Sequence, residues 1–159
     1  MHEEATKFLI NKKIPIKQSD TETAYDSSMN TIFVAQKHLK PGTFAHEVGH
    51  ALVDKNNLYE NEELATIMKN VVANAKYVVK KKDDEYFIYL HSDKFIRNYQ
   101  GKTYINVTKK YKNLKKGEHL KIGAFDYRDL EEYVSVGYET FVSNPQLLYD
   151  KDKELYDFL

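Results

Sequence analysis

Two histidines and a glutamate stand close together in the segment His46-Glu47-Val48-Gly49-His50. On a helix, residues i and i+4 lie on the same face, so His46 and His50 would direct two imidazoles to one point. That arrangement suits a tetrahedral zinc ion. Glu47 is rotated by about 100° from His46 around the helix axis, so its carboxylate would reach a water molecule on the ion rather than the ion itself.

Zinc lowers the pKa of a coordinated water molecule to roughly 7. Glu47 would then accept its proton as a general base and later deliver that proton to a leaving amine. Gly49 leaves the helix surface bare, so that a neighbouring segment can approach closely. A plain alternative is a pair of histidines on a solvated helix, but the apolar flanks Phe44-Ala45 and Ala51-Leu52-Val53 favour a half-buried helix.

A catalytic zinc site needs a third protein ligand beside these two histidines. Residues 51–56, directly after His50, contain no histidine, so the third ligand must come from another element. The remaining histidines are scattered on predicted loops or strands: His2, His38, His91 and His119. A late helical segment is the better source, because it carries the carboxylates of Glu131, Glu132 and Glu139. Glu132 and Glu139 are seven residues apart and share one stripe of a helix, so periodicity alone does not choose between them.

The elements that must position these residues can be predicted from local patterns. Residues 2–12 have apolar side chains at helical spacing, and Thr31–Ala35 is a β-branched, aromatic run typical of a strand. Thr43 is expected to cap the metal-binding helix, residues 44–56, through its hydroxyl. A second helix over residues 60–79 has one apolar face: Leu64, Ile67, Met68, Val71, Ala75 and Val78.

The chain changes character between residues 76 and 122. Glu85–Leu90 and Thr103–Val107 are strand-like, with turns at Asp83-Asp84 and Gln100-Gly101. These patterns predict a β-rich insertion between the two halves of the candidate site.

The late helix is expected over Asp129–Ser143, with Asp129 as its cap. Asn144-Pro145 should end it, because proline disfavours helix in the residue before it. A short last helix over residues 152–159 is expected to follow.

The segment His46–Ala51 resembles the active-site helix of the anthrax toxin lethal factor-like metallopeptidases, a group that includes the Pro-Pro endopeptidases. The second motif of that family is a glutamate followed by aromatic and small residues that run toward Asn-Pro, and residues 132–145 match this layout. The resemblance implies that Zn²⁺ is held by His46, His50 and Glu132. The family's small residue in this motif, which lets the two helices pack closely, is here a serine.

A related version of the second motif occurs in domains attached to head-morphogenesis proteins of tailed phages, where it follows a Tyr-x-Gly-Lys-x-Tyr element. Tyr99–Tyr104 fits that element. This chain departs from the family in two respects. The two ligand-bearing motifs are 82 residues apart, which is longer than usual, and Phe125 replaces the tyrosine that stabilises the oxyanion seven residues before the glutamate. Tyr127 and Tyr104 are the candidates for that role here.

Together these features imply one α+β, zincin-like metallopeptidase domain over residues 1–159. It would contain a small mixed β-sheet, an active-site helix and a C-terminal ligand helix. An extended substrate is expected to pair as an added strand along residues 31–35.

Composition narrows the classes of protein that remain. There is no cysteine, which excludes disulfides, thiolate zinc sites and cysteine nucleophiles. With 24 basic and 24 acidic residues, the chain has no long-range attraction to nucleic acid or to an anionic membrane. Its lysine clusters, Lys80-Lys81-Lys82 and those between Lys109 and Lys121, are interpreted as solvated hairpin tips rather than a binding patch.

The expected function is that of a zinc-dependent endopeptidase of the gluzincin type. We expect a peptide or protein substrate, a monomer, and no nucleic-acid or membrane partner. One alternative is a catalytically silent binding module of a phage or toxin protein, and another is a cytoplasmic regulatory metallopeptidase that cuts one partner protein. The polar N-terminus has no apolar core typical of a signal sequence. The compartment therefore stays open between the cytoplasm, a mature secreted form and a phage- or toxin-associated domain.

Overall fold

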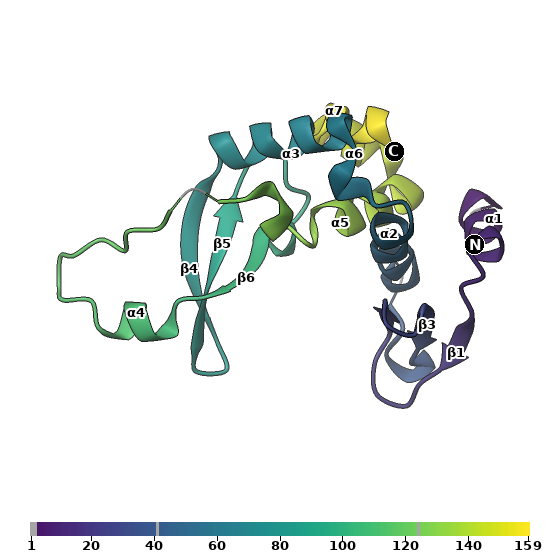
Figure 1. Ribbon diagram of the computed structural model, residues 1–159, viewed down its shortest axis with the longest axis horizontal. Helices are drawn as coiled ribbons and strands as arrows, with labels where there is room; N and C mark the ends of the chain where they lie inside the picture. The colour runs from purple at the N-terminus through teal and green to yellow at the C-terminus, as the bar shows by residue number, and fades with distance from the viewer. Residues whose placement is uncertain (1–2, 41, 124) are drawn as a thin grey trace.

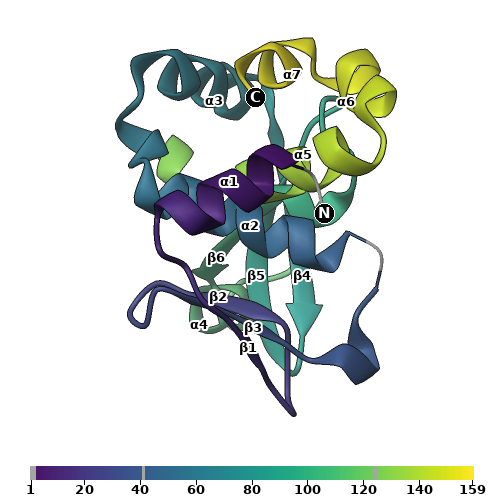
Figure 2. The same cartoon turned by 90° about the vertical axis from the view of Figure 1, so that its right-hand side faces the viewer.

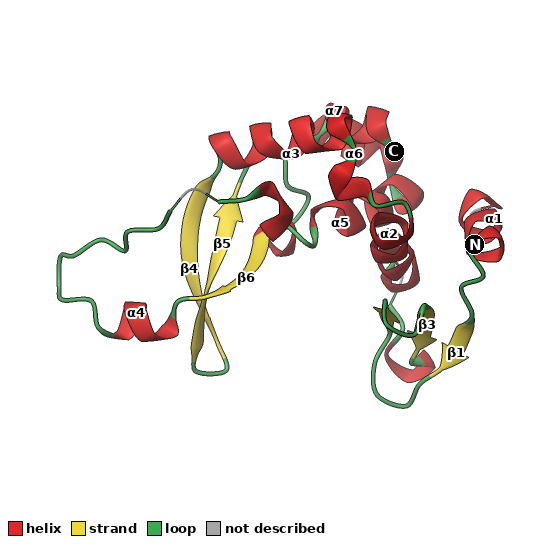
Figure 3. Cartoon of the chain, viewed as in Figure 1, coloured by secondary structure: helices red, strands yellow, loops and turns green. Residues whose placement is uncertain are grey.

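The computed structural model describes residues 3–40, 42–123 and 125–159, which form an α+β arrangement with two three-stranded sheets (Figures 1 and 3). The α-helices are α1 (Glu3–Asn11), α2 (Thr43–Lys55), α3 (Glu62–Asn74), α4 (Thr108–Lys112), α5 (Tyr133–Ser143), α6 (Pro145–Lys151) and α7 (Lys153–Phe158). The strands are β1 (Ile16–Gln18), β2 (Ala24–Asp26), β3 (Thr31–Val34), β4 (Lys76–Lys82), β5 (Glu85–His91) and β6 (Lys102–Asn106). Short 3₁₀ helices are η1 (Gln36–His38), η2 (Leu58–Glu60), η3 (Asn98–Gly101) and η4 (Tyr127–Asp129). No helix in the described ranges is both long and apolar enough to cross a membrane.

The first sheet is small and mixed, as predicted. β3 lies in its centre, parallel to β1 on one side and antiparallel to β2 on the other. Ile32 of β3 is fully buried and packs with Val48 and Ala51 of α2. The expectation that a substrate pairs along residues 31–35 is wrong, because β1 and β2 already occupy both edges of β3.

The second sheet, in the order β4-β5-β6, confirms the predicted β-rich insertion. Asp83 and Asp84 join β4 to β5 with positive φ angles of 51° and 63°, which aspartate tolerates in a tight hairpin turn. The second helix was predicted to continue to residue 79, but α3 ends at Asn74. The β-branched residues Val78 and Val79 pair with β5 instead, so tertiary pairing overrides the helical period there.

Two helices begin at positions that differ from the predicted ones. α2 starts after Gly42, whose φ of 89° suits glycine, and Thr43 makes no capping hydrogen bond. α5 starts at Tyr133 rather than Asp129, because Asp126 and Asp129 form a capping box that holds the separate turn η4. The predicted end of α5 at Ser143 is confirmed.

The buried side chains form two apolar cores. The first core lies among α3, α5, α6, α7 and the second sheet, and contains Leu64, Met68, Val71, Leu90, Leu130, Tyr133, Val134, Leu148 and Leu155. The second core joins α1, β3 and α2 and contains Ala5, Leu9, Ile14, Ile32, Val48, Ala51 and Tyr138. Figure 2 shows α1 crossing α2 above the first sheet. The two cores meet at the contact between α2 and α5.

Candidate metal centre

The centre is built where α2 crosses α5. A Cβ atom placed on Gly49 would lie 2.7 Å from the Cα atom of Ser135, so only glycine allows the two backbones to come this close. The crossing brings the start of α5, and with it Glu132, against the face of α2 that carries both histidines. This observation supports the predicted reason for Gly49 and for a small residue at position 135.

Three potential ligand atoms converge at this crossing. His46 Nε2 lies 3.0 Å from Glu132 Oε2 and 3.2 Å from His50 Nε2. His50 Nε2 lies 3.1 Å from the same Glu132 oxygen, which closes the triangle. The side chain of Glu132 is only 5 % exposed and that of His50 is 27 % exposed. Among the described residues, this is the group of histidine and carboxylate side chains able to hold a metal ion.

The size of the triangle fits a tetrahedral zinc ion. Zinc bonds to nitrogen and oxygen of about 2.0–2.1 Å at tetrahedral angles place neighbouring ligand atoms about 3.3 Å apart. The three edges here measure 3.0 to 3.2 Å. The triangle would need to expand only slightly for His46, His50 and Glu132 to act as three zinc ligands. Three protein ligands leave the fourth position of a tetrahedral ion open.

A second glutamate lies behind His46. Glu139 Oε2 is 3.3 Å from His46 Nδ1, close enough for electrostatic attraction, although Nδ1 makes no hydrogen bond of acceptable geometry. Arg97 holds this carboxylate with both terminal nitrogens, at 3.3 and 2.9 Å. A carboxylate at this position favours a proton on Nδ1 and leaves the Nε2 lone pair free for a metal.

The charges of the cluster depend strongly on one another. Burial alone would lower the pKa of His46, but the carboxylates of Glu132 and Glu139 outweigh it and raise that pKa to about 9. Burial likewise favours the protonated form of Glu132, yet hydrogen bonds from His46, His50 and Tyr104 hold its pKa well below the ordinary value. A cation bound by these three residues would compete with the protons that the same carboxylate attracts.

Glu47 lies beside the triangle and does not join it. Its Oε2 accepts a hydrogen bond of 2.8 Å from the backbone N–H of Tyr25 in β2. Burial raises the pKa of Glu47, and this hydrogen bond partly opposes the shift. Glu47 and His50 line the same open cleft, of about 540 Å³, together with Tyr59 and Arg128. A carboxylate with a raised pKa beside an open cleft is suited to accept and release a proton.

The structure separates the two candidate tyrosines. The Tyr104 hydroxyl donates a 2.5 Å hydrogen bond to Glu132 Oε1 and lies 3.3 Å from the Tyr99 hydroxyl. Tyr127 is buried, and its hydroxyl donates to the backbone oxygen of Tyr59 at 2.6 Å. The expectation that Tyr127 assists at the metal is therefore not supported, because its ring is buried in the first core and its hydroxyl is bonded to the backbone of Tyr59.

The backbone of β6 explains how Tyr104 reaches the cluster. Tyr104 has a φ of 60°, which is rare for a bulky residue, at a shift in the register between β5 and β6. Such a conformation costs about 1–3 kcal/mol and is characteristic of functional sites. The sequence predicted a regular strand here and missed this feature. Tyr99 belongs to the Tyr-x-Gly-Lys-x-Tyr element, but its place beside Tyr104 was not predicted. Arg97 lies two residues before that element and had no sequence signal.

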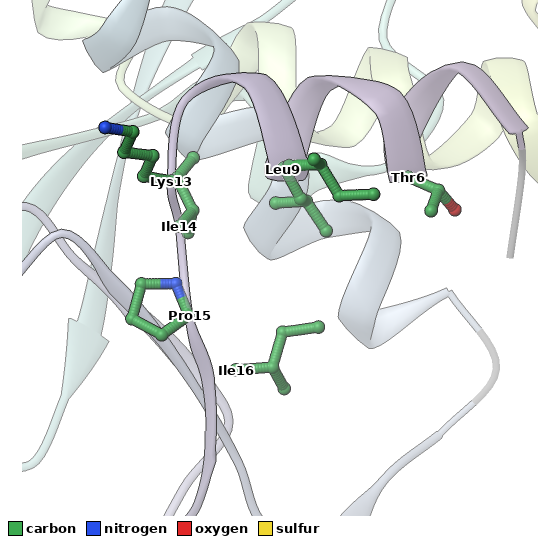
Figure 4. A pocket seen from close by; sticks show the side chains of 7 residues that line it. Thr6, Leu9, Lys13, Ile14, Pro15 and Ile16 are labelled. Carbon is green, nitrogen blue, oxygen red and sulfur yellow. The ribbon is translucent and has the colours of Figure 1, made fainter.

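The other histidines do not join the cluster within the described structure. His91 and His119 are exposed, on β5 and on the loop after α4. His2 and the side chain of His38 lie outside the described residues. An apolar hollow between α1 and β1, lined by Leu9, Ile14 and Ile16, also lies apart from the cluster and holds none of its residues (Figure 4).

Comparison of the chain with protein-family models, with curated proteins and with solved structures found no match.

Replacing Gly49 with alanine is expected to force α2 and α5 apart. The added Cβ would meet the Ser135 backbone at 2.7 Å, and overpacking of this kind costs about 1–3 kcal/mol of folding stability, beyond the roughly 1 kcal/mol that alanine regains in a helix. Urea denaturation would measure the loss. Gly123→Ala is the matched control, because a Cβ there meets no atom within 4 Å. Equal stability of the two variants would contradict the tight crossing.

Proposed function

We propose that this chain is a zinc-dependent endopeptidase with a zincin-like fold. The observation that supports it most is the triangle of His46, His50 and Glu132 with edges near those of a zinc tetrahedron. These three residues would hold Zn²⁺. Glu47 follows His46 on the same helix and borders an open cleft, and the pKa of its carboxyl group is raised.

When bound, zinc would supply a Lewis acid that activates water and polarises a carbonyl group. Glu47 would accept a proton from the attacking water and pass it to the departing amine. The Tyr25 N–H bond to Oε2 orients the carboxylate and leaves its second oxygen for this task. The Tyr104 hydroxyl would turn from Glu132 to donate a hydrogen bond to the oxygen that gains negative charge.

β2 takes over the substrate-pairing role that was expected of β3. It is an edge strand of the first sheet, and the Tyr25 N–H points away from β3 toward Glu47. An extended peptide beside this edge would carry its backbone past Glu47 and the cleft, while the Tyr25 N–H stays bonded to Glu47 and takes no part in the pairing.

The test is metal dependence of both binding and cleavage. Protein stripped with a chelator is expected to bind stoichiometric zinc, measured by elemental mass spectrometry, and only the zinc-loaded form should cleave a mixed peptide pool analysed by mass spectrometry. Failure to bind zinc would reject the metal site. Stoichiometric zinc without any cleavage would reject the peptidase and favour the silent binding module.

Tyr104→Phe is expected to reduce the turnover number about a hundredfold, because one donor to a developing oxyanion contributes that much. Zinc affinity should fall by no more than about tenfold, since Tyr104 touches a ligand and is not one itself. Tyr127→Phe is the matched control. It removes a hydrogen bond and about 1 kcal/mol of stability, and it should leave the turnover number unaltered. The reverse pattern would return the catalytic role to Tyr127.

A further inference from the structure

Three lysines share one face of the second sheet. Lys80 and Lys82 alternate along β4, and register places Lys102 of β6 beside Tyr89 on that same face. The ammonium group of Lys80 lies 4.8 Å from the centre of the Tyr89 ring. Lys80 is half-buried, contrary to its interpretation as a solvated hairpin tip.

Lys102 brings this charge next to the metal cluster. Its Nζ lies 4.2 Å from the centre of the Tyr104 ring and 5.6 Å from that of Tyr99. Since the Tyr104 hydroxyl donates to Glu132, a single side chain separates this ammonium group from a predicted metal ligand. The residue as a whole is only 8 % exposed. Burial, followed by repulsion from Lys82, lowers the pKa of Lys102, which means that the surrounding protein disfavours the charged form of this side chain.

None of these three lysines has an anionic partner among the described residues. No carboxylate lies within ion-pair distance of Lys80, Lys82 or Lys102, although Glu85 stands opposite Lys82 in the hairpin. Glu132 attracts Lys102, but its oxygens are engaged by the two histidines and by Tyr104. His46 Nδ1 is the single buried, unbonded side-chain nitrogen or oxygen in the described structure. Lys102 Nζ donates no hydrogen bond to the described protein, so it must reach solvent.

We propose that Lys102, supported by Lys80 and Lys82, binds a carboxylate of the peptide substrate beside the metal cluster, which makes acidic peptides the preferred substrates. This inference rests on the proposed peptidase function. The side chain of Lys102 is largely covered, whereas its ammonium group reaches solvent between two aromatic rings and has no internal anion. Such a group is suited to bind an external carboxylate. The substrate carboxylate would belong either to an aspartate or glutamate side chain or to the C-terminus of the peptide.

The test measures the binding of two fluorescein-labelled peptide pools of equal length to the zinc-loaded Glu47→Gln variant. One pool carries aspartate at alternate positions, and the other carries the isosteric asparagine. Each is made with a free C-terminal acid and with a C-terminal amide. We expect about tenfold tighter binding of the aspartate pool, or of the free-acid form, and a preference that weakens with added salt.

Lys102→Met should abolish most of that preference, because methionine retains the apolar stem and removes the charge. Lys80→Met should reduce it less, and it provides a second variant should Lys102→Met fail to fold. Lys81→Met is the matched control, since Lys81 lies on the opposite face of β4 and pairs with Asp84 at 3.2 Å. The Lys81→Met protein is expected to show the same preference for the aspartate pool as the protein with all its lysines.

The outcomes separate this inference from the proposed function. Equal binding of all four peptide forms, with hydrolysis by the wild-type protein, would overturn the lysine site and leave the peptidase standing. Lysine-dependent binding of the acidic pool without hydrolysis would keep the site and reject the peptidase. Displacement of the acidic pool by a lower concentration of single-stranded oligothymidylate would overturn the peptide assignment and identify a nucleic-acid site.

Discussion

Replacing Glu47 with glutamine is expected to slow peptide hydrolysis by about 10²–10⁴-fold while zinc remains bound. An amide cannot accept the proton of the attacking water. Its oxygen can still accept the 2.8 Å hydrogen bond from the Tyr25 N–H, so the position of the side chain is preserved. Initial rates on the mixed peptide pool measure the loss, and elemental analysis of the same samples measures the metal.

Glu63→Gln provides the control for this experiment. Glu63 is an exposed glutamate in the first turn of α3 and belongs to neither motif nor to the metal cluster, so its variant should hydrolyse peptides at the wild-type rate. A Glu47→Gln protein that retains wild-type hydrolysis would eliminate Glu47 as the general base.

Replacing Glu132 with alanine is expected to weaken zinc binding by more than about a hundredfold, since removing even an outer partner of a ligand costs 10- to 100-fold. The variant also leaves His46 and His50 without the carboxylate that both contact. Zinc affinity can be measured by competition with a chromophoric chelator. Hydrolysis should disappear together with the metal.

Two neighbouring glutamates serve as comparisons for this variant. Glu139→Ala should weaken zinc only about tenfold, because Glu139 faces Nδ1 of His46 and leaves the three ligands in place. Glu131→Ala should have no effect, because Glu131 is exposed and takes no part in the triangle. A larger loss of zinc from Glu139→Ala than from Glu132→Ala would move the third ligand to Glu139.

The relation between these two glutamates shows how far the sequence could lead. Spacing placed Glu132 and Glu139 on one stripe, and both do contact His46. They contact opposite sides of one imidazole ring, Nε2 and Nδ1. Periodicity reports the face of a helix and not which ring nitrogen each residue meets, so at the level of the sequence only the family resemblance favoured Glu132. In the structure Glu132 contacts Nε2 of both histidines, whereas Glu139 contacts Nδ1 of His46 alone.

Elsewhere, local patterns failed where long-range pairing decides the structure. The strands β1 and β2 are three residues long, too short for a periodic signal, and their pairing with β3 changed the predicted substrate edge. The helical stripe of α3 was continued into β4, because apolar residues such as Val78 fit both periods. The left-handed backbone of Tyr104 has no local sequence signal, since glycine is the usual residue with positive φ.

A metal ion bound at this site would link the two apolar cores as well as take part in the reaction. His46 and His50 belong to the helix of the second core, whereas Glu132 directly precedes Tyr133 of the first. A bound ion would therefore close the loop of 82 residues between His50 and Glu132, and it would hold the two cores together at the Gly49–Ser135 contact. If the two cores moved apart, the ligands would separate. Release of the ion would therefore be coupled to partial unfolding of the second core.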